Sequence, residues 1–336
     1  MFATIISLSS IYIFLILFLI FFSKKLNLYD HPLDRKIHKS KVINTGGVSI
    51  YILFIIIVSS FELNNLIESI IVYGFLILIS GFLDDLFKLS PGVKLILILF
   101  PSSYLIYNGF ELTNIGNYKY IDTIYLGKFS FLFTLLCVGL LTNAVNYTDG
   151  IDGLALSIVI SCIIYFIFLS NDYNLKYLFY LFLIPLTINL IFNFFPIESG
   201  YKLFLGDSGS LFLGFLLSFI LIYLSIYEKI HPAILIWSVW YPVYDFLFVT
   251  FNRIKLRISP FAPRKDHAHH VLYFVLKKNN LLLIFIFLLL NSLIISLGYV
   301  INKYLGEFYS LLSFKLLFII FVYIRYKNLK FLKNNE

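Results

Sequence analysis

The chain has few charged residues for its length. Only 13% of its 336 residues are Asp, Glu, Lys or Arg, whereas a typical soluble domain carries about 25%. So few charges cannot cover the surface of a soluble protein of this size. The apolar set makes up 60% of the chain, and the mean hydropathy is +0.91. The composition excludes a soluble globular, a disordered or a fibrous protein and indicates a protein whose solvent is the lipid bilayer.

Cysteine is almost missing, since the chain has only Cys137 and Cys162, and both lie inside apolar runs. Two such residues provide neither a disulfide framework nor the spacing of a thiolate metal site. Internal repeats, low-complexity linkers and polar stretches of domain length are missing too. We therefore predict a single integral membrane domain over residues 1–336.

The long apolar runs are candidates for transmembrane helices, each placed to within a few residues. There are eleven, at about 4–22, 47–61, 66–83, 93–108, 129–145, 154–169, 177–195, 211–227, 232–251, 281–301 and 308–326. The second, fourth and sixth are short for a bilayer. The predicted fold class is an all-α, polytopic membrane bundle of about 11 transmembrane helices.

Basic residues are distributed unevenly between alternate connections. With the N-terminus outside, 20 Lys and Arg residues fall at inner connections or in the C-terminal tail, and 5 fall at outer connections. Cytoplasmic loops of membrane proteins carry such an excess. This distribution predicts an outer N-terminus and a cytoplasmic C-terminus, and the net charge of +8 does not indicate nucleic-acid binding.

Polar motifs interrupt the apolar runs on this inner side. Asp84 and Asp85 are adjacent carboxylates at the end of the third run. They suit Mg²⁺ binding or phosphate chemistry, and a solvated helix end is the structural alternative. Between the fifth and sixth runs lie Asn143, Asn146, Asp149 and Asp152. Burying four such groups without partners is costly, and an N-cap role would explain Asp152 alone, so the set favours a binding site.

Two further motifs lie on the same side. Gly206–Ser210 opens the eighth run, where a helix N-terminus suits a phosphate and Asp207 suits a metal ion, with helix capping as the alternative. The segment 259–270 predicts an anion-binding or acid/base cluster, with a transition-metal site or a simple basic loop as alternatives. Its charged and titratable residues are Arg264, Lys265, Asp266, His267, His269 and His270.

Asp245 lies inside the ninth run, about two turns from its inner end. A carboxylate within a span is a candidate functional residue. Arg253 follows eight residues later on roughly the same helical face, and we predict it as a distant partner of Asp245.

In their order, these motifs resemble the polyprenyl-phosphate N-acetylhexosamine-1-phosphate transferases (glycosyltransferase family 4), most strongly over residues 30–270. The final motif is similar to that of the GlcNAc-type initiating enzymes; the phospho-MurNAc-pentapeptide translocase has three consecutive histidines there. Asn44-Thr45 and Ala268 depart from the family pattern without touching a proposed chemical group. The elements that carry the resemblance are Asp34-Arg35-Lys36-Ile37-His38 with Gly46-Gly47, Asp84-Asp85, Lys94, residues 143–153, Gly206–Ser210 with Leu213-Gly214, and Ser259-Pro260-Phe261 followed by His267-Ala268-His269-His270.

The resemblance implies a Mg²⁺-dependent phosphotransferase, with Mn²⁺ as the alternative metal. Its substrates would be a UDP-N-acetylhexosamine, foremost UDP-GlcNAc, and undecaprenyl phosphate, and UMP would be released. The implied metal ligands are Asp207 and Asp149. The implied catalytic residues are Asp84, Asp85, Asp149, Asp152, His267, His269 and His270. The implied substrate-binding residues are Lys36, His38, Lys94, Asn143, Asn146 and Arg264.

The implied site lies at the cytoplasmic face of the bacterial inner membrane, where the product would begin a cell-envelope polysaccharide. One alternative is the same reaction with another UDP-sugar, such as a 6-deoxy sugar for O-antigen. Another is a transporter or flippase, which would need charges in the middle of several spans and repeated halves. Only Asp245 and Lys315 meet the first condition. The sugar, the pathway, direct displacement against a covalent intermediate, and a homodimer are left open.

Overall fold

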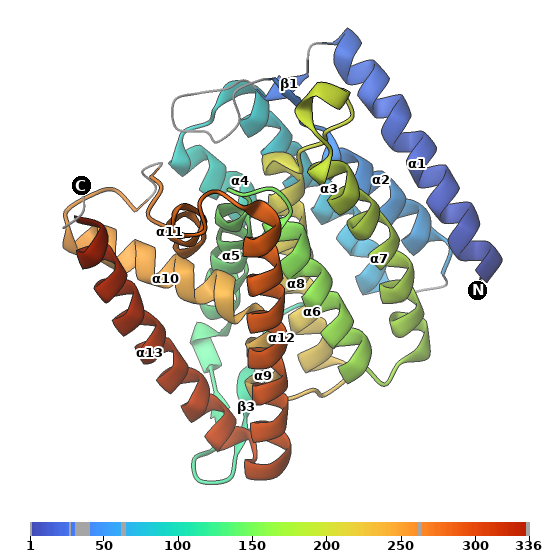
Figure 1. The fold of residues 1–336 in the computed structure, drawn as a ribbon. Helices are drawn as coiled ribbons and strands as arrows, with labels where there is room; N and C mark the ends of the chain where they lie inside the picture. The colour runs from blue at the N-terminus through green and yellow to red at the C-terminus, as the bar shows by residue number, and fades with distance from the viewer. Residues whose placement is uncertain (1, 27, 31–40, 62–64, 261–263, 334–336) are drawn as a thin grey trace.

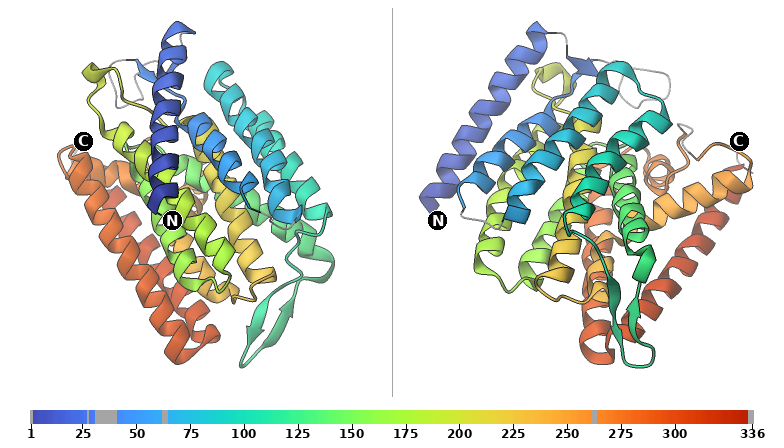
Figure 2. Two further views of the ribbon diagram at one scale, coloured as in Figure 1. Left: turned by 90° about the vertical axis from the view of Figure 1, so that its right-hand side faces the viewer. Right: turned by 180° about the vertical axis from the view of Figure 1, so that it is seen from behind.

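Apolar runs of the sequence fold into long helices that lie side by side in one bundle (Figure 1). The computed structural model describes residues 2–26, 28–30, 41–61, 65–260 and 264–333. A helix satisfies its backbone hydrogen bonds internally, which a segment surrounded by lipid requires. The first and last helices lie at opposite edges of the bundle, both in Figure 1 and in the view from behind (Figure 2, right).

The elements follow one another with short connections. In chain order the helices are α1 (Phe2–Lys25), α2 (Gly46–Ser59), α3 (Asn65–Phe87), α4 (Pro91–Tyr107), η1 (Gly127–Phe129), α5 (Ser130–Thr148), α6 (Leu154–Leu169), α7 (Tyr173–Phe194), η2 (Ile197–Ser199), α8 (Gly206–Ile226), α9 (Pro232–Leu235), η3 (Ile236–Val239), α10 (Trp240–Lys255), α11 (Ala268–Val275), α12 (Asn280–Leu305) and α13 (Glu307–Lys333). The strands are β1 (Tyr29–Asp30), β2 (Val42–Ile43), β3 (Asn114–Tyr118) and β4 (Asp122–Tyr125).

The predicted fold class is confirmed, because the chain is a polytopic helical membrane protein with little sheet. Within the described residues, eight helical stretches are long and apolar enough to cross a membrane. Three further apolar helices, α2, α4 and α6, are shorter, with 14, 17 and 16 residues. These are the three runs that the sequence marks as short. The number of crossings and the orientation stay predictions.

The ninth apolar run forms one helical stretch, Pro232–Lys255, in which α9, η3 and α10 follow one another and the middle part is a 3-10 helix. Pro242 has no N–H, so it cannot bond to the carbonyl of Ser238 four residues earlier. That carbonyl accepts a hydrogen bond from the Cys162 thiol instead, with 3.2 Å between Sγ and O. After this interruption, α10 runs obliquely across its neighbours (Figure 1).

Two small antiparallel sheets depart from the all-helical expectation. In one, β1 pairs with β2, and in the other, β3 pairs with β4 to form a hairpin before α5. The hairpin extends from one end of the bundle (Figure 2). There the Nε2 atom of His231, in the connection before α9, lies 3.0 Å from the backbone oxygen of Asn117. The strands have only 2 to 5 residues, too few to give a period-two pattern in the sequence.

Glycine allows α2 and α3 to approach the start of α8 closely. A Cβ atom on Gly47 would lie 2.2 Å from the backbone nitrogen of Gly209, and one on Gly81 would lie 2.4 Å from the carbonyl oxygen of Asp207. Such distances leave no room for any side chain, so the helix backbones touch directly. This contact places the last turn of α3 against the first turn of α8.

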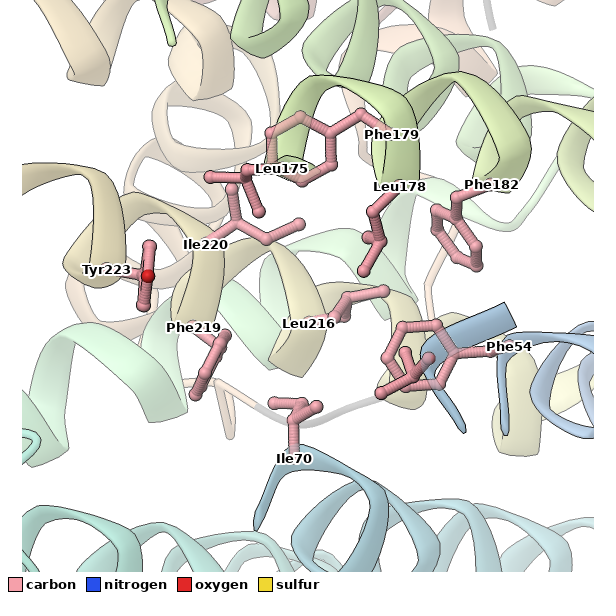
Figure 3. A pocket seen from close by; sticks show the side chains of 11 residues that line it. Phe54, Ile70, Leu175, Leu178, Phe179, Phe182, Leu216, Phe219, Ile220 and Tyr223 are labelled. Atoms are coloured by element: carbon pink, nitrogen blue, oxygen red, sulfur yellow. The ribbon is translucent and has the colours of Figure 1, made fainter. Parts of the chain in front are cut away.

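The core between α2, α3, α7 and α8 is well filled. It leaves a cavity of about 20 Å³ whose lining side chains are aliphatic or aromatic, among them Phe54, Leu178 and Leu216 (Figure 3). A space of this size holds at most about one water molecule, and this one has no charged or amide side chain to bind it. We interpret it as a packing gap.

We predict that Gly47→Ala lowers the stability of the protein by about 1–3 kcal/mol, because the methyl group must force two helix backbones apart. The measurement is the thermal unfolding midpoint in detergent. Gly92→Ala is the matched control, since a Cβ there would meet nothing within 4 Å. Equal midpoints for the two variants would contradict the close contact.

Candidate active site

A cavity of about 1110 Å³ lies where α3, α5, α7 and α10 end and where α4, α8 and α12 begin. Since α5 starts after the hairpin and ends at this cavity, the two features lie at opposite ends of that helix. The structure thus gathers the motifs that the alternation of spans assigned to one face. The charged side chains of the lining are Asp30, Asp84, Asp85, Lys88, Lys94, Asp149, Asp152, Lys202, Asp207, Arg253, Arg264 and Lys265.

Lys94 joins three helices in the wall of this cavity. Its Nζ atom lies 2.9 Å from Oδ2 of Asp84 at the end of α3 and 3.1 Å from Oδ2 of Asp207 at the start of α8. The Lys94 side chain is only 16% exposed, so these ion pairs are weakly screened by water. Two carboxylates that would otherwise repel each other are held together by one ammonium group.

Asn146 on α5 extends this arrangement. Its Nδ2 donates to Oδ1 of Asp207 at 2.7 Å, and its Oδ1 accepts from Lys94 at 3.3 Å. Asn143, one turn earlier, also lines the cavity, but its Nδ2 donates to a backbone carbonyl of its own helix at 2.8 Å. Asn146 therefore orients the Asp207 carboxylate, whereas Asn143 does not.

Asp85 occupies the start of α8, where the sequence predicts a phosphate. Its Oδ1 accepts the backbone N–H of Asp207 at 3.1 Å, and its Oδ2 accepts that of Ser208 at 3.2 Å. A carboxylate at the positive end of a helix is stabilising. The prediction that a phosphate binds these two amides is wrong, because α3 delivers a carboxylate to them. Only the contact of α3 with α8 reveals this.

Asp149 follows the last residue of α5 and lines the cavity. Among the described residues, its carboxylate has no hydrogen-bond or ion-pair partner. Burial, followed by the charge of Asp207, raises its pKa well above the ordinary value. A bound cation or a proton would neutralise this carboxylate.

Asp152 is paired, in contrast to Asp149. Its Oδ2 lies 2.7 Å from Nζ of Lys202, in the connection before α8, and accepts from Nδ2 of Asn280 at 3.2 Å. It does not cap α6, because the N-cap residue is Gly153 in a left-handed conformation (φ +78°). The simple capping alternative for Asp152 is therefore wrong, and the residue instead ties three segments together.

His267 is held by the carboxylate inside α10. Its Nδ1 lies 2.7 Å from Oδ2 of Asp245, whose Oδ1 accepts the backbone N–H of Ala268 at 2.8 Å. Because the carboxylate takes Nδ1, the Nε2 atom of the imidazole is the one left for a ligand. His267 lines the cavity.

Arg253 pairs with Asp266, and not with Asp245 as predicted. Its Nη2 lies 2.6 Å from Oδ1 of Asp266, and its Nε lies 3.1 Å from Oδ2. A guanidinium group favours such a two-point contact with a carboxylate. Burial opposes ionisation of Asp266, but the hydrogen bonds and charge of Arg253 outweigh it and hold the pKa below its ordinary value. Asp245 was misassigned because His267 comes from a separate segment of the chain.

The other two histidines have different surroundings. His269 is fully buried, with Nδ1 2.8 Å from the hydroxyl oxygen of Tyr241, and it does not line the cavity. His270 lines the cavity beside Gly150, where an added Cβ would lie 2.9 Å from its Nε2. Burial and the charge of His267 lower the pKa of His270 to about 4, so it is neutral at pH 7. His267 and His270 can reach a ligand, and His269 supports the wall.

The remaining predicted residues fall into two groups. Arg264 lines the cavity and is exposed. Lys36 and His38, with Asp34 and Arg35 of the same motif, lie outside the described residues.

Single polar residues that gave no pattern in the sequence also contribute to the site or support it, and these are Asn44, Lys202, Asn280 and Arg325.

Oxygen donors dominate this part of the cavity. Asp84, Asp149, Asp207 and Asn146 offer carboxylate and amide oxygens, the ligands that Mg²⁺ and Mn²⁺ prefer. No group of three His, Cys, Asp or Glu residues in the described part of the chain already has a metal-binding arrangement. The chemistry of the donors fits a hard divalent cation, with the unpaired Asp149 as the carboxylate that most needs one.

Comparisons with protein-family models and with known proteins indicate the same family. The family model described as glycosyl transferase family 4 matches residues 67–225. A probable undecaprenyl-phosphate N-acetylglucosaminyl 1-phosphate transferase of Bacillus subtilis is 32% identical over 254 residues, which cover 73% of this chain and 70% of that protein. An undecaprenyl-phosphate alpha-N-acetylglucosaminyl 1-phosphate transferase of Escherichia coli O157:H7 is 28% identical over 339 residues, which cover 94% of this chain and 89% of that protein.

We predict that Lys94→Met destabilises the protein by about 3 kcal/mol, because it leaves Asp84 and Asp207 without their shared cation. Unfolding is measured in detergent with EDTA present. Lys128→Met is the matched control, since Lys128 is exposed at the other end of α5. A loss no larger than that of the control would show that the ammonium group does not hold the two carboxylates together.

We predict that the protein loses stability between pH 6.5 and pH 4, partly through His270. Its folded-state pKa of about 4 lies below the ordinary value of 6.5. Below pH 6.5 the unfolded chain therefore binds a proton that the folded protein excludes, and folding stability falls. His270→Gln should show a shallower decline of the unfolding midpoint over this range. Parallel declines in the two proteins would contradict a buried, neutral His270.

Proposed function

The chain belongs to glycosyl transferase family 4, and from this premise we propose that it transfers GlcNAc 1-phosphate from UDP-GlcNAc to undecaprenyl phosphate. A phosphate oxygen of the lipid attacks the sugar-bearing β-phosphorus of the UDP-sugar. The bond between this phosphorus and the oxygen of the UMP leaving group breaks. The products are UMP and an undecaprenyl diphosphate that carries the sugar. The printed names of the relatives support both the acceptor and the transferred group.

One observation carries this proposal, namely the mixture of cations and carboxylates in a single cavity at the ends of apolar helices. Two anionic substrates must meet, so their repulsion has to be offset by positive groups. Lys88, Arg264 and Lys265 line the cavity and can serve this purpose, whereas Lys94 and Lys202 already pair with carboxylates of the wall. The lipid phosphate is already ionised at neutral pH, so the reaction does not require a strong base. A site at the end of the helices suits a substrate whose tail stays in the membrane.

Mg²⁺ is the cofactor we propose, with Mn²⁺ as the alternative. Asp207 and Asp149 would hold the ion, in keeping with the oxygen donors of the cavity. Bound there, the cation would offset the negative charge of the reacting phosphates. Lys94 and Asn146 keep the Asp207 carboxylate oriented through their contacts at 3.1 and 2.7 Å.

The protein's own histidines serve the diphosphate in this proposal. His267 is oriented by Asp245 and keeps Nε2 available as a hydrogen-bonding group at the cavity. His270 is neutral at pH 7 and can donate or accept one hydrogen bond there. Arg264 adds an exposed positive charge at the same cavity.

The uneven distribution of basic residues supports a cytoplasmic site. Undecaprenyl phosphate would then be met in the inner leaflet of the bacterial inner membrane, and UDP-GlcNAc would enter from the cytoplasm. The lipid-linked sugar would begin a cell-envelope polysaccharide. Incubation with a panel of UDP-N-acetylhexosamines, followed by mass spectrometry of the lipid product, identifies the sugar.

We predict that Asp207→Asn and Asp84→Asn each lower turnover by about 10²–10³-fold, because Asp207 would hold the cation that offsets transition-state charge and Lys94 holds Asp84 beside it. The assay follows radiolabelled UDP-GlcNAc into lipid product, together with UMP release. Asp122→Asn is the matched control, because Asp122 is exposed on the β3–β4 hairpin.

The same assay tests the metal and the reaction class. EDTA should stop turnover in the wild type, and added Mg²⁺ should restore it. Asp149→Asn should need more Mg²⁺ than the wild type for half-maximal turnover. Wild-type activity in both Asp207→Asn and Asp84→Asn would overturn the assignment of these residues, and no UMP release from the wild type would overturn the transferase itself.

A further inference from the structure

The last helix, α13, reaches the histidine segment through one buried cation. Arg325 is 3% exposed, and its Nη2 donates to the carbonyl oxygen of Asp266 at 2.5 Å. Its guanidinium carbon lies 5.1 Å from the ring centroid of Phe248 on α10. The family model matches residues 67–225, so α13 lies outside the segment that this model matches.

Further hydrogen bonds hold α13 against the broken ninth run. Nε1 of Trp237 donates to Oγ of Ser310 at 2.9 Å, and the hydroxyl of Tyr244 donates to the carbonyl of Phe314 at 2.5 Å. These contacts fix α13 along the side of η3 and α10. Several contacts therefore fix the position of α13, and this position places Arg325 beside Asp266.

The turn before the histidines is held from three sides. Arg253 binds the carboxylate of Asp266, Arg325 binds its carbonyl, and Asp245 binds the next side chain, His267. Two cations and two carboxylates balance one another around this turn. The buried Arg325 guanidinium has the Asp266 carbonyl as its hydrogen-bond acceptor and the Phe248 ring beside it, and its Nε has no hydrogen-bond partner among the described residues, so the contact with Asp266 is the one that holds it at this turn.

We propose that Arg325 is a positioning residue of the site, which fixes the Asp266 turn and thereby presents His267 to the cavity. The last helix is then part of the working site and not only a membrane anchor. This inference rests on the proposed transferase function, since it assigns Arg325 a role in that reaction through His267.

A double-mutant cycle with His267 tests this role. Arg325→Met should lower turnover by about 10²-fold, the scale of a misplaced catalytic group. In a His267→Asn background the same change should cost about twofold or less, because the two residues act as a unit. Arg325→Lys should recover part of the turnover, since an ammonium group can also donate to the Asp266 carbonyl. Lys315→Met, exposed on the same helix, is the control for a general effect on α13.

A second measurement does not depend on activity. The rate at which diethyl pyrocarbonate modifies His267, read by mass spectrometry, should rise in Arg325→Met and stay unchanged in Lys315→Met. Equal losses of turnover in both backgrounds, or an unchanged modification rate, would overturn the proposal. A wild type that releases no UMP would instead overturn the proposed function, and the modification rate would still report whether Arg325 positions His267.

Discussion

The ammonium group of Lys94 is the contact on which the acidic half of the site depends. It lies between Asp84 of α3 and Asp207 of α8, at 2.9 and 3.1 Å, and it comes from a third helix, α4. Without a cation, two carboxylates brought together at a helix junction would repel each other and push the helices apart. The same contact that joins the helices also holds both carboxylates at the wall of the cavity. Lys94 therefore contributes both to the stability of the fold and to the arrangement of the candidate site.

The histidine half of the site is organised on the same principle but with different partners. Arg253 binds the carboxylate of Asp266, Arg325 binds its carbonyl, and Asp245 binds His267, so three side chains hold the turn before the histidines. Asp149 lies in the cavity with both halves and lacks a partner among the described residues. A proton or a bound cation would neutralise this carboxylate, as ion pairs with lysine neutralise Asp84, Asp152 and Asp207.

The apolar runs predicted the helices well, because hydrophobic length decides where a segment can cross lipid. The three short helices, α2, α4 and α6, also correspond to short apolar runs in the sequence. Pairings could not be predicted, because they depend on which helix ends meet. Asp85 on the amides of α8 and Lys202 on Asp152 join segments far apart in the sequence, and Arg253 reaches Asp266 across the connection between α10 and α11. The 3-10 turns around Ser238 were not predicted, because the carbonyl that Pro242 leaves free finds its partner on α6.

Asp85 has a consequence for how such a protein can diversify. Its carboxylate accepts the backbone N–H groups of Asp207 and Ser208, so the first turn of α8 serves the contact between α3 and α8. Side chains at the cavity that no helix junction uses, such as Arg264 and His270, are then the groups left to contact a ligand. A change of ligand preference would need new side chains at these positions but no new chain path. Ligand selectivity can therefore change through substitutions of side chains while the arrangement of the helices stays the same.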